Sequence, residues 1–494
     1  MAAPGDLAAL SLVDAAEAIR DGSVTSSALT EIAIDRLETI GRELNCTISV
    51  ERESALEAAA MLDRERKNGR LRGPLHGVPL AHKDLFYRAG KTVTCGSEIR
   101  RDFVPTTTAT VLTRLDQAGA VTIGALHLAE FAFSPTGFNK HFGSCRNPWS
   151  RDHVTGGSSS GSGAAVAARL VYGSLGTDSG GSIRHPAAMC GVTGVKPTQT
   201  RVSRAGVMPL SFSLDCVGPL TRTARDGARL LTIIAGQDAA DSTASSVSVP
   251  DYETALSGDI RGLRIAVPDD YYYDLVADEI RTHLAESISV FEELGAKIIK
   301  RAVPNIGLIN ALAQLVMVVE AATIHQEWLR SRRDDYAEIV RNRIEPGLLV
   351  PATRYCEALA MRASIVEEFI ATVFGDADIV HLPAISIPVP TIAETTEGDP
   401  AEIGKRLGAL THCTRGINYL GLPVVSVPAG FTSNGLPCGF QLLGRPFAES
   451  VLLKAAHAYQ SVTDWQSRSP ALAENEVTSA PRHGDSEVAL PARH

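Results

Sequence analysis

The sequence predicts an α/β protein in which helical layers cover a buried sheet. From Gly77 onward, short apolar runs broken by Gly and Pro alternate with helical patterns, as in "GVPLAHKD", then "TATVLTRLDQAGA", then "VTIGAL". Residues 262–300 repeat this alternation. Such alternation is typical of a sheet with helices packed on it. The composition supports a large core, because 44% of the 494 residues are hydrophobic and only 21% are charged.

The elements can be predicted in chain order. We expect residues 1–65 to form an N-terminal helical layer, because apolar residues recur at helix spacing after the candidate N-caps Thr25, Ser26 and Ser27. Residues 262–300 predict a strand "LRIAVP", a helix "DEIRTHLAESISVFEELG" and a strand "AKIIKRAV". We expect residues 300–375 to be mainly helical, followed by the buried strands "DIVHLPAI" and "LPVVSVPAGF".

One large domain is the simpler interpretation of this pattern. No low-complexity linker occurs between residues 65 and 465, so we expect a single domain over residues 1–465. Residues 466–494 are polar, contain Pro and show no periodicity, so we expect a loose C-terminal tail.

Charge and hydropathy argue against several classes of protein. The net charge is −9 and no basic run occurs, so we expect no nucleic-acid partner. The N-terminus lacks the pattern of a signal peptide. The most apolar stretch, "LINALAQLVMVVEAATI", is interrupted by Asn310, Gln314 and Glu320, so we expect no membrane span. Eight scattered cysteines without a CxxC pair favour reduced thiols and a cytoplasmic location, with no metal site.

The stretch from Asp152 to Gly194 combines seven serines and many glycines with apolar residues. Loop filling is the simplest explanation, but buried hydroxyls need partners. A phosphate-binding loop is excluded, because the segment has neither the Lys of a P-loop motif nor the third Gly of the dinucleotide-binding motif. The "GSSSG" around Ser159 matches a nucleophile elbow, yet a charged, Pro-bearing segment precedes it where a buried strand is required. The fourth interpretation is that one of the serines is a nucleophile whose proton is taken by a base other than histidine.

Ser182 is the candidate for that nucleophile. It lies in "GTDSGGSIRHP", where the backbone N–H groups of Ser179, Gly180, Gly181 and Ser182 could stabilise an oxyanion. Lys83, at the end of the apolar run "GVPLAHKDLF", could act as the base if burial keeps it neutral. A salt bridge between Lys83 and its neighbour Asp84 is the alternative interpretation.

Three blocks of sequence resemble the amidase signature family. "GGSSSGSGAAVAA", "GTDSGGSIRHPAAMCGVTGVKPT" and "HGVPLAHKDLF" occur in the family's order, and "NPWSRDHVTGGSSSGS" and the segment from "NYLGLPVVSVPAGF" onward extend the resemblance. Residues 300–375 and the tail carry no motif of the family. The resemblance implies a single large α/β/α sandwich with a central mixed β-sheet.

The resemblance also implies a Ser-cisSer-Lys triad. Ser182 falls at the nucleophile, Ser158 at the bridging serine and Lys83 at the base. The backbone of Ser179, Gly180, Gly181 and Ser182 falls at the oxyanion hole, and the Gly157–Ser158 peptide is expected to be cis. No cofactor or metal is implied.

The remaining polar residues near these motifs have structural interpretations. We expect Asp84 to point away from Lys83, His82 and His185 to be hydrogen-bonded structural histidines, and Arg184 to pair with a carboxylate such as Asp178. Ser159, Ser160 and Ser162 are assigned no direct chemistry.

The leading functional hypothesis is an amidase that cleaves the carbon–nitrogen bond of a small apolar or aryl amide, with carbamates (urethanase activity), anilides and esters as additional substrates. It rests on the apolar stretches of residues 300–375, taken as the substrate-side lining. Its expected partners are a small-molecule amide or carbamate and, by default, a second copy in a homodimer. The alternative is the glutaminase subunit of a tRNA-dependent amidotransferase, which shares the triad.

Overall fold

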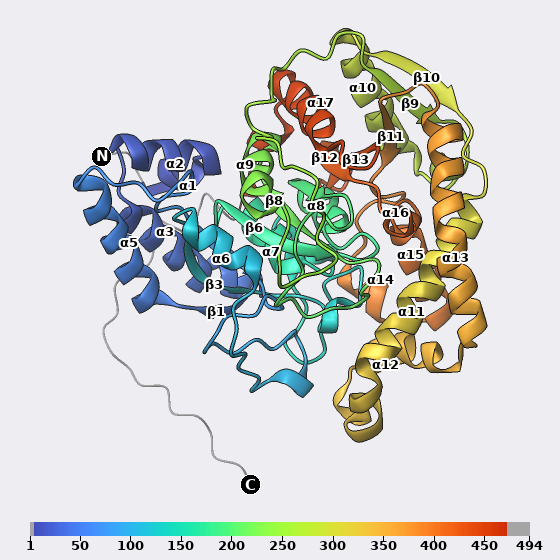
Figure 1. The fold of residues 1–494 in the computed structure, drawn as a ribbon, viewed down its shortest axis with the longest axis horizontal. Helices are drawn as coiled ribbons and strands as arrows, with labels where there is room; N and C mark the ends of the chain where they lie inside the picture. The colour runs from blue at the N-terminus through green and yellow to red at the C-terminus, as the bar shows by residue number, and fades with distance from the viewer. Residues whose placement is uncertain (1–3, 472–494) are drawn as a thin grey trace.

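The computed structural model describes residues 4–471, arranged around a central eight-stranded sheet (Figure 1). The strands follow the order β10 (Lys297–Arg301), β9 (Arg264–Pro268), β11 (Ile379–Pro383), β13 (Pro437–Gly444), β12 (Val424–Phe431), β7 (Thr193–Lys196), β8 (Cys216–Thr221) and β6 (Gly173–Asp178). The β10/β9 and β9/β11 pairs are parallel and the other pairs are antiparallel. The predicted α/β fold with a central mixed sheet is therefore confirmed.

Two smaller sheets accompany the central one. The first has the order β1 (Thr47–Val50), β3 (Val121–Leu126) and β2 (Pro79–Lys83), and its strand β2 lies against the edge strand β6 of the central sheet. The second pairs β4 (Arg146–Asn147) with β5 (Ser150–Val154). The contact between β2 and β6 creates a buried seam between two sheets.

Helices cover both faces of the central sheet. On one face, α9 (Ala224–Ile234), α17 (Glu449–Val462) and α10 (Asp278–Glu293) pack on β7, β8, β12 and β13 (Figure 1). On the other face, α8 (Arg184–Cys190) packs on β7, β12 and β13, while α7 (Ser160–Ala167) packs on β6. The architecture is thus three-layered, as the strands' burial on both faces requires.

The remaining helices form peripheral groups. The N-terminal group comprises α1 (Pro4–Ala9), α2 (Leu12–Asp21), α3 (Ser26–Glu38), α4 (Ile40–Glu43) and α5 (Arg52–Lys67), followed by α6 (Thr110–Gln117). The later group comprises α11 (Ile306–Ser331), α12 (Glu338–Ile344), α13 (Ala352–Phe369), α14 (Ile392–Thr396), α15 (Pro400–Thr411) and α16 (Arg415–Leu420). Short turns are η1 (Glu98–Arg100), η2 (Glu130–Ala132), η3 (Tyr271–Tyr273), η4 (Arg333–Asp335), η5 (Glu345–Leu349), η6 (Ile370–Phe374) and η7 (Trp465–Ser467).

Local sequence signals account for several helix ends. Of the three candidate caps before α3, Thr25 is the one used: its side chain accepts a hydrogen bond from the N–H of Ala28 at 3.1 Å. Helix α9 begins with a reciprocal capping box between Thr223 and Asp226. The buried Asp226 carboxylate also accepts from the N–H of Val13 at 3.0 Å, so this cap joins α9 to α2.

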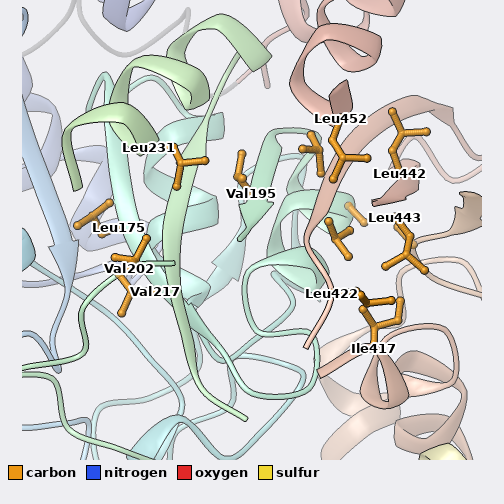
Figure 2. Close-up of a cluster of buried hydrophobic side chains, with 14 of the residues drawn as sticks. Leu175, Val195, Val202, Val217, Leu231, Ile417, Leu422, Leu442, Leu443 and Leu452 are labelled. Carbon is orange, nitrogen blue, oxygen red and sulfur yellow. The ribbon is translucent and has the colours of Figure 1, made fainter. Parts of the chain in front are cut away.

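The core lies between the central sheet and its helices. Leu175, Val195, Val217, Leu442 and Leu443 on the strands are buried, as are Leu231 of α9 and Leu452 of α17 (Figure 2). Leu442 lies on the side of Leu452, whereas the next residue, Leu443, lies toward Leu422 on the opposite face. The predicted strands β11 and β12 are nearly continuous apolar runs, as expected for strands buried on both faces. The strands β6, β7, β8 and β13 were not predicted, and the first three are short segments in which Gly, Thr or Pro interrupts the apolar residues.

Several expectations from the sequence can be compared with this fold. The strands and helices predicted over residues 262–300 appear as β9, α10 and β10, and residues 300–375 are mainly helical. All eight cysteines are free thiols, as expected. The single-domain assignment to residues 1–465 stays a prediction, and most of the expected tail lies outside the described residues.

Helix α11 is the one helix in residues 4–471 that is long and apolar enough to cross a membrane. Half of its most apolar stretch is buried, and it packs against α16, α13 and η5. The buried Glu320 accepts hydrogen bonds from Ser213 and Tyr355 at 2.6 and 2.9 Å. These contacts are those of a core helix in a globular domain.

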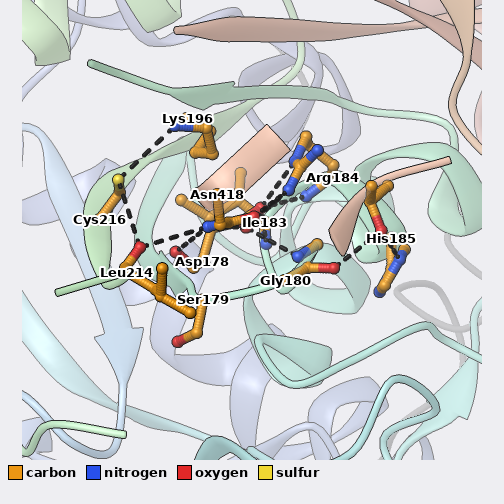
Figure 3. Close-up of polar contacts among 12 residues, drawn as sticks. Asp178, Ser179, Gly180, Ile183, Arg184, His185, Lys196, Leu214, Cys216 and Asn418 are labelled. Atoms are coloured by element: carbon orange, nitrogen blue, oxygen red, sulfur yellow. Dashed lines mark hydrogen bonds and ion pairs between the residues drawn. The ribbon is translucent and has the colours of Figure 1, made fainter. Parts of the chain in front are cut away.

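A buried polar network joins the sheet to α8 and α16 (Figure 3). Asp178, at the end of β6, and Arg184 form an ion pair at 3.0 Å, and neither side chain is exposed. Asn418 of α16 donates to Asp178 at 3.0 Å and accepts from Arg184 at 2.6 Å. Burial would raise the pKa of Asp178, but the charge and hydrogen bonds of Arg184 outweigh it and hold the pKa well below its usual value. The predicted pairing of Arg184 with Asp178 is confirmed.

We predict that Arg184→Met destabilises the protein by about 3–5 kcal/mol, because it leaves a buried carboxylate without its cation. The measurement is the midpoint of urea unfolding. Arg261→Met removes one partner of an exposed pair with Asp259 and should leave the midpoint unchanged. The double variant Arg184→Met/Asp178→Asn should recover part of the loss. A midpoint for Arg184→Met equal to that of the wild type would contradict a stabilising role for the buried ion pair.

Candidate active site

Lys83 lies at the end of β2 in the seam against β6. Its side chain is 1% exposed, and Nζ donates to Ser158 Oγ at 2.7 Å and to Thr177 Oγ1 at 2.9 Å. Burial lowers the pKa of Lys83 to about 7, although Asp215, Asp178 and Cys95 act in the opposite direction. The structure therefore brings together Lys83 and Ser158, two of the three predicted catalytic residues. With a pKa of about 7, a substantial fraction of the Lys83 amine is neutral at pH 7.

Asp84 takes no part in this arrangement. Its carboxylate accepts hydrogen bonds from the N–H and the hydroxyl of Thr94, at 2.9 and 2.5 Å. Burial raises the pKa of Asp84 to about 6, against the effect of those hydrogen bonds. The expectation that Asp84 points away from the lysine is confirmed.

Ser158 precedes α7 and is fully buried. The Gly157–Ser158 peptide is cis, as expected. The next residue, Ser159, donates its N–H to the carbonyl oxygen of Ser182 at 3.2 Å, so the two serine segments are joined through the backbone. No hydrogen bond links Ser158 Oγ to Ser182 Oγ within the described residues, and such contacts are often long before substrate binds.

Ser182 lies in the loop between β6 and α8. It is 9% exposed and lines a cavity of about 40 Å³. This cavity is the route by which a carbonyl carbon could approach the Ser182 hydroxyl, while Lys83 and Ser158 stay behind it.

The predicted oxyanion loop is held by two carboxylates. Gly181 donates its N–H to Asp178 Oδ1 at 2.7 Å, and the Ser179 hydroxyl donates to Asp215. The N–H groups of Ser179, Gly180 and Ser182 make no hydrogen bond within residues 4–471, which leaves them free for an oxyanion. Gly181 differs from the prediction, because its N–H is already occupied.

Gly181 is nevertheless required at its position. Its φ is +133°, and a Cβ there would meet the ring of His185 and the hydroxyl of Thr414. His185 Nε2 lies 2.8 Å from Thr414 Oγ1, and burial lowers the pKa of His185 to about 4. His82 is likewise buried, with Nδ1 accepting from the N–H of Leu175 at 3.1 Å. Both histidines have the hydrogen-bonded, neutral character that was expected of structural residues.

The other serines of the segment also have structural partners. Ser160 Oγ lies 2.9 Å from His127 Nδ1, and Ser162 donates to the Leu175 carbonyl at 3.2 Å. Ser159 donates to the Thr177 carbonyl at 3.3 Å. These contacts satisfy buried hydroxyls and place none of the three serines in the cavity.

The lining of the Ser182 cavity contradicts the apolar site that was expected from residues 300–375. Gln314 and Met317 of α11, Arg343 of α12 and Arg415 of α16 lie around the nucleophile. The complete lining is Ala132, Phe133, Ser134, Pro135, Ser179, Gly180, Ser182, His185, Leu210, Gln314, Met317, Arg343, Thr411 and Arg415. Most apolar side chains of α11 are buried in the core and do not line the cavity. Two of the residues that do line it are the cations Arg343 and Arg415.

Arg343 and Arg415 are cations without an acidic partner. Arg343 donates to the Phe133 carbonyl at 3.1 Å, and Arg415 donates to Thr411 Oγ1 at 2.7 Å. Neither forms an ion pair with a carboxylate in residues 4–471. Burial and the proximity of Arg415 lower the pKa of Arg343 to about 10, and burial also lowers the pKa of Arg415. Two guanidinium groups without a carboxylate partner in the described residues, beside Ser182, have the chemistry to bind an anionic group.

A larger outer cavity adjoins this one. Its volume is about 960 Å³, and it shares Gln314, Arg343 and Arg415 with the cavity at Ser182. The arginines therefore lie where the outer cavity meets the cavity at Ser182. They were not among the residues predicted from the sequence. The available signal was two arginines, Arg341 and Arg343, in "EIVRNRIEPG" and one, Arg415, in "THCTRGINYLG", and nothing in the sequence distinguishes Arg343 from Arg341.

The chain is similar to known amidases and amidotransferases over most of its length. The Amidase family model matches residues 28–453. Curated relatives that are 36–38% identical carry the name of one subunit of glutamyl-tRNA(Gln) amidotransferase. The relative from Nitrosococcus oceani is 38% identical over 93% of this chain and 99% of its own.

Solved structures agree with the fold. A chain from a vestigial protein complex, which bears on the evolutionary origins of an s-triazine catabolic enzyme, is 33% identical. It has a TM-score of 0.85 and matches 92% of this chain and 98% of its own. The glutamyl-tRNA(Gln) amidotransferase subunit from Thermotoga maritima is 30% identical, with a TM-score of 0.77 over 93% of this chain and 96% of its own.

These relatives correct two expectations. The predicted amidase for a small apolar or aryl substrate is wrong, because the curated relatives carry the amidotransferase name that was the alternative. The expectation of a small-molecule partner alone, without nucleic acid and with a homodimer by default, is wrong for the same reason: that name includes a tRNA and denotes one subunit of an enzyme. The more general prediction, an enzyme that hydrolyses amide bonds, agrees with the family match. The chain belongs to the amidase family.

Proposed function

We propose that this chain is the glutaminase subunit of a tRNA-dependent amidotransferase, which hydrolyses the side-chain amide of glutamine and releases ammonia. The observation that carries the proposal is the match to subunits of that name over 93% of the chain. The proposal includes partner subunits and a charged tRNA as the acceptor of the ammonia, and a cytoplasmic location.

In the first half of the proposed reaction, neutral Lys83 is the base. It takes a proton from Ser158, which takes one from Ser182, and the Ser182 oxygen forms a bond to the amide carbon. The free N–H groups of Ser179, Gly180 and Ser182 stabilise the oxyanion. The proton then returns through Ser158 to the leaving nitrogen, the carbon–nitrogen bond breaks and ammonia departs.

In the second half, water attacks the acyl-enzyme. Its proton passes by the same relay to Lys83, and the tetrahedral intermediate collapses with the proton returned to Ser182. Glutamate is released. The 2.7 Å hydrogen bond between Lys83 and Ser158 supports this relay, because it joins the proposed base to the bridging hydroxyl without a water between them.

The arginines supply the substrate contact in this proposal. A guanidinium group binds a carboxylate through two parallel hydrogen bonds, and such charge-assisted contacts are stronger than neutral ones. Arg343 and Arg415 would hold the α-carboxylate of glutamine while the amide reaches Ser182. Their lack of an acidic partner in the described residues supports this role.

A second candidate function is favoured by one observation. The lining of the Ser182 cavity contains two arginines and no Asp or Glu, so it provides no carboxylate for the α-ammonium of glutamine. A carboxylated amide without an ammonium group, such as glutaramate, fits this charge better. The similarity to the chain from the vestigial complex is compatible with a substrate other than glutamine.

We predict that the purified chain releases ammonia from glutamine and that Ser182→Ala lowers this rate by about 10⁴-fold or more. Glutaramate and an uncharged aryl amide complete the panel, with ammonia release as the common assay. Glutaramate cleaved much faster than glutamine would favour the second candidate. Activity that survives in Ser182→Ala, or activity on the aryl amide alone, would contradict both.

We predict an acidic limb in the pH profile of kcat/KM with a midpoint near the Lys83 pKa of about 7. A base works only when deprotonated, so the rate should rise with pH through 7 and fall about tenfold per pH unit below it. Asp84→Asn is the control, because this neighbour titrates near 6 but faces Thr94. Loss of the limb in Asp84→Asn would show that Lys83 is not the group that titrates.

We predict that Arg343→Met raises KM by about 10–100-fold, which corresponds to the loss of a hydrogen bond to a charged group. The control is Arg341→Met, two residues away, whose side chain pairs with Asp334 and does not line the cavity. Michaelis–Menten kinetics on glutamine provide the measurement. An unchanged KM in Arg343→Met would remove this residue from substrate binding.

A further inference from the structure

A third cavity, here called the back cavity, reaches the seam at Thr177, the hydrogen-bond partner of Lys83. Its volume is about 240 Å³, enough for several water molecules. The lining comprises Thr177, Arg204, Ala205, Val207, Pro209, Phe212, Asp215, Val217, Ala240 and Asp241. Phe212 is 46% exposed and Ala240 is also exposed, whereas Thr177 at the inner end is 5% exposed. The cavity therefore extends from the surface to strand β6.

This back cavity is distinct from the cavity at Ser182. The segment 208–215 separates the two: Leu210 lines the front cavity, while Pro209 and Phe212 line the back one. A substrate that fills the front cavity leaves the back cavity open to water.

Thr177 connects the back cavity to the lysine. Its Oγ1 accepts a hydrogen bond from Lys83 Nζ at 2.9 Å. The proton of the Thr177 hydroxyl has no acceptor among residues 4–471, so it is available to water in the cavity. Thr177 is also a fixed point, because its backbone N–H and carbonyl both bond to Ser159 Oγ at 3.3 Å.

The proposed reaction requires such a connection. Hydrolysis converts an amide and water into a carboxylate, ammonia and one proton. When ammonia leaves as the neutral molecule, that proton is first on the new carboxyl group. When the carboxyl group ionises inside the site, its proton passes through Ser182 and Ser158 to Lys83, which must lose it before it can act as a base again. Lys83 is 1% exposed and its other partner, Ser158, is fully buried.

We propose that Thr177 and the back cavity form the route by which protons pass between Lys83 and bulk water. This inference rests on the proposed role of Lys83 as the base. In each transfer, the Thr177 hydroxyl takes a proton from Lys83 Nζ and gives its own proton to a water in the cavity, so that Lys83 becomes neutral and the water carries the charge. Thr177 is thus a positioning and relay residue that acts through Lys83.

Charged groups around the route fit this role. Asp215, Asp178 and Cys95 are the titratable groups that act on Lys83, and Asp215 also lines the back cavity. Arg204 and Asp241 lie on the same cavity, 3.9 Å apart. Negative charge beside the path favours the passage of a proton away from the lysine.

The test uses p-nitrophenyl acetate with the full-length chain. Its leaving group departs as an anion without a proton, so the proton taken from Ser182 remains on Lys83 after acylation and must leave before deacylation. Stopped-flow kinetics separate the burst of acylation from the steady-state deacylation. Thr177→Val should leave the burst rate within about twofold but slow deacylation by about tenfold or more, within the usual range for proton-transfer catalysis.

Two further measurements distinguish a relay from a structural role. Thr177→Ser should restore deacylation, and raising the concentration of a small buffer base should accelerate deacylation in Thr177→Val more than in the wild type. Ala205→Phe, which narrows the back cavity without touching Lys83, should slow deacylation, whereas Ala239→Phe, beside the cavity but outside its lining, should not.

The outcomes separate the two proposals. A burst and a deacylation that slow equally in Thr177→Val, with no response to buffer, would mean that Thr177 only orients Lys83 and would overturn the route. An unchanged deacylation rate in both Thr177→Val and Ala205→Phe would also overturn the proton route, but it would not contradict the proposed function. Absence of any Ser182-dependent acyl-enzyme in the wild type, from either the ester or glutamine, would overturn the proposed function together with this inference.

Discussion

The arrangement of this site depends on the burial of one amine, that of Lys83. Lys83 can serve as a base near neutral pH only where water is excluded, because desolvation is what lowers its pKa to about 7. The seam between β2 and β6 provides this environment, and the hydroxyls of Ser158 and Thr177 provide the hydrogen bonds. The small sheet and the central sheet must therefore meet closely, and the packing of the N-terminal half maintains that contact.

A buried carboxylate, that of Asp178, positions the loop that contains Ser182. The Asp178 carboxylate accepts the N–H groups of Gly181 and Ile183 at 2.7 and 3.1 Å, and Arg184 and Asn418 neutralise and orient it. The loop is thereby fixed before substrate arrives, and Ser179, Gly180 and Ser182, whose N–H groups have no partner in the described residues, line the cavity. Preorganised donors of this kind need no rearrangement when charge develops on the substrate. The same network ties β6 to α8 and α16, so stability and site geometry share their residues.

The polar residues of the Ser182 cavity indicate what kind of substrate fits there. An amidase fold does not by itself determine what is cleaved, since unrelated substrates are handled on one scaffold. Here α12 and α16 place Arg343 and Arg415 beside Ser182, and no acidic side chain of the described residues neutralises them. An uncompensated pair of guanidinium groups is costly unless an anion occupies the site. The apolar stretches of residues 300–375 were therefore misleading, because most of those side chains belong to the core.

The sequence by itself determined the α/β class, the strands β2, β3, β9, β10, β11 and β12, the pairing of Arg184 with Asp178, the outward turn of Asp84, and the motifs that contain Lys83, Ser158 and Ser182. These features depend on local periodicity or on short, contiguous motifs. Only the tertiary structure decided that Gly181 donates to Asp178, that Arg343 and Arg415 share a cavity with Ser182, and that Thr177 connects Lys83 to the back cavity. The hydrogen bond from Gly181 to Asp178 joins residues only three apart, but it depends on a loop conformation that Arg184 and Asn418 hold in place. The other two features depend on segments far apart in the chain, and which side chain of a helix faces a cavity is set by packing rather than by composition.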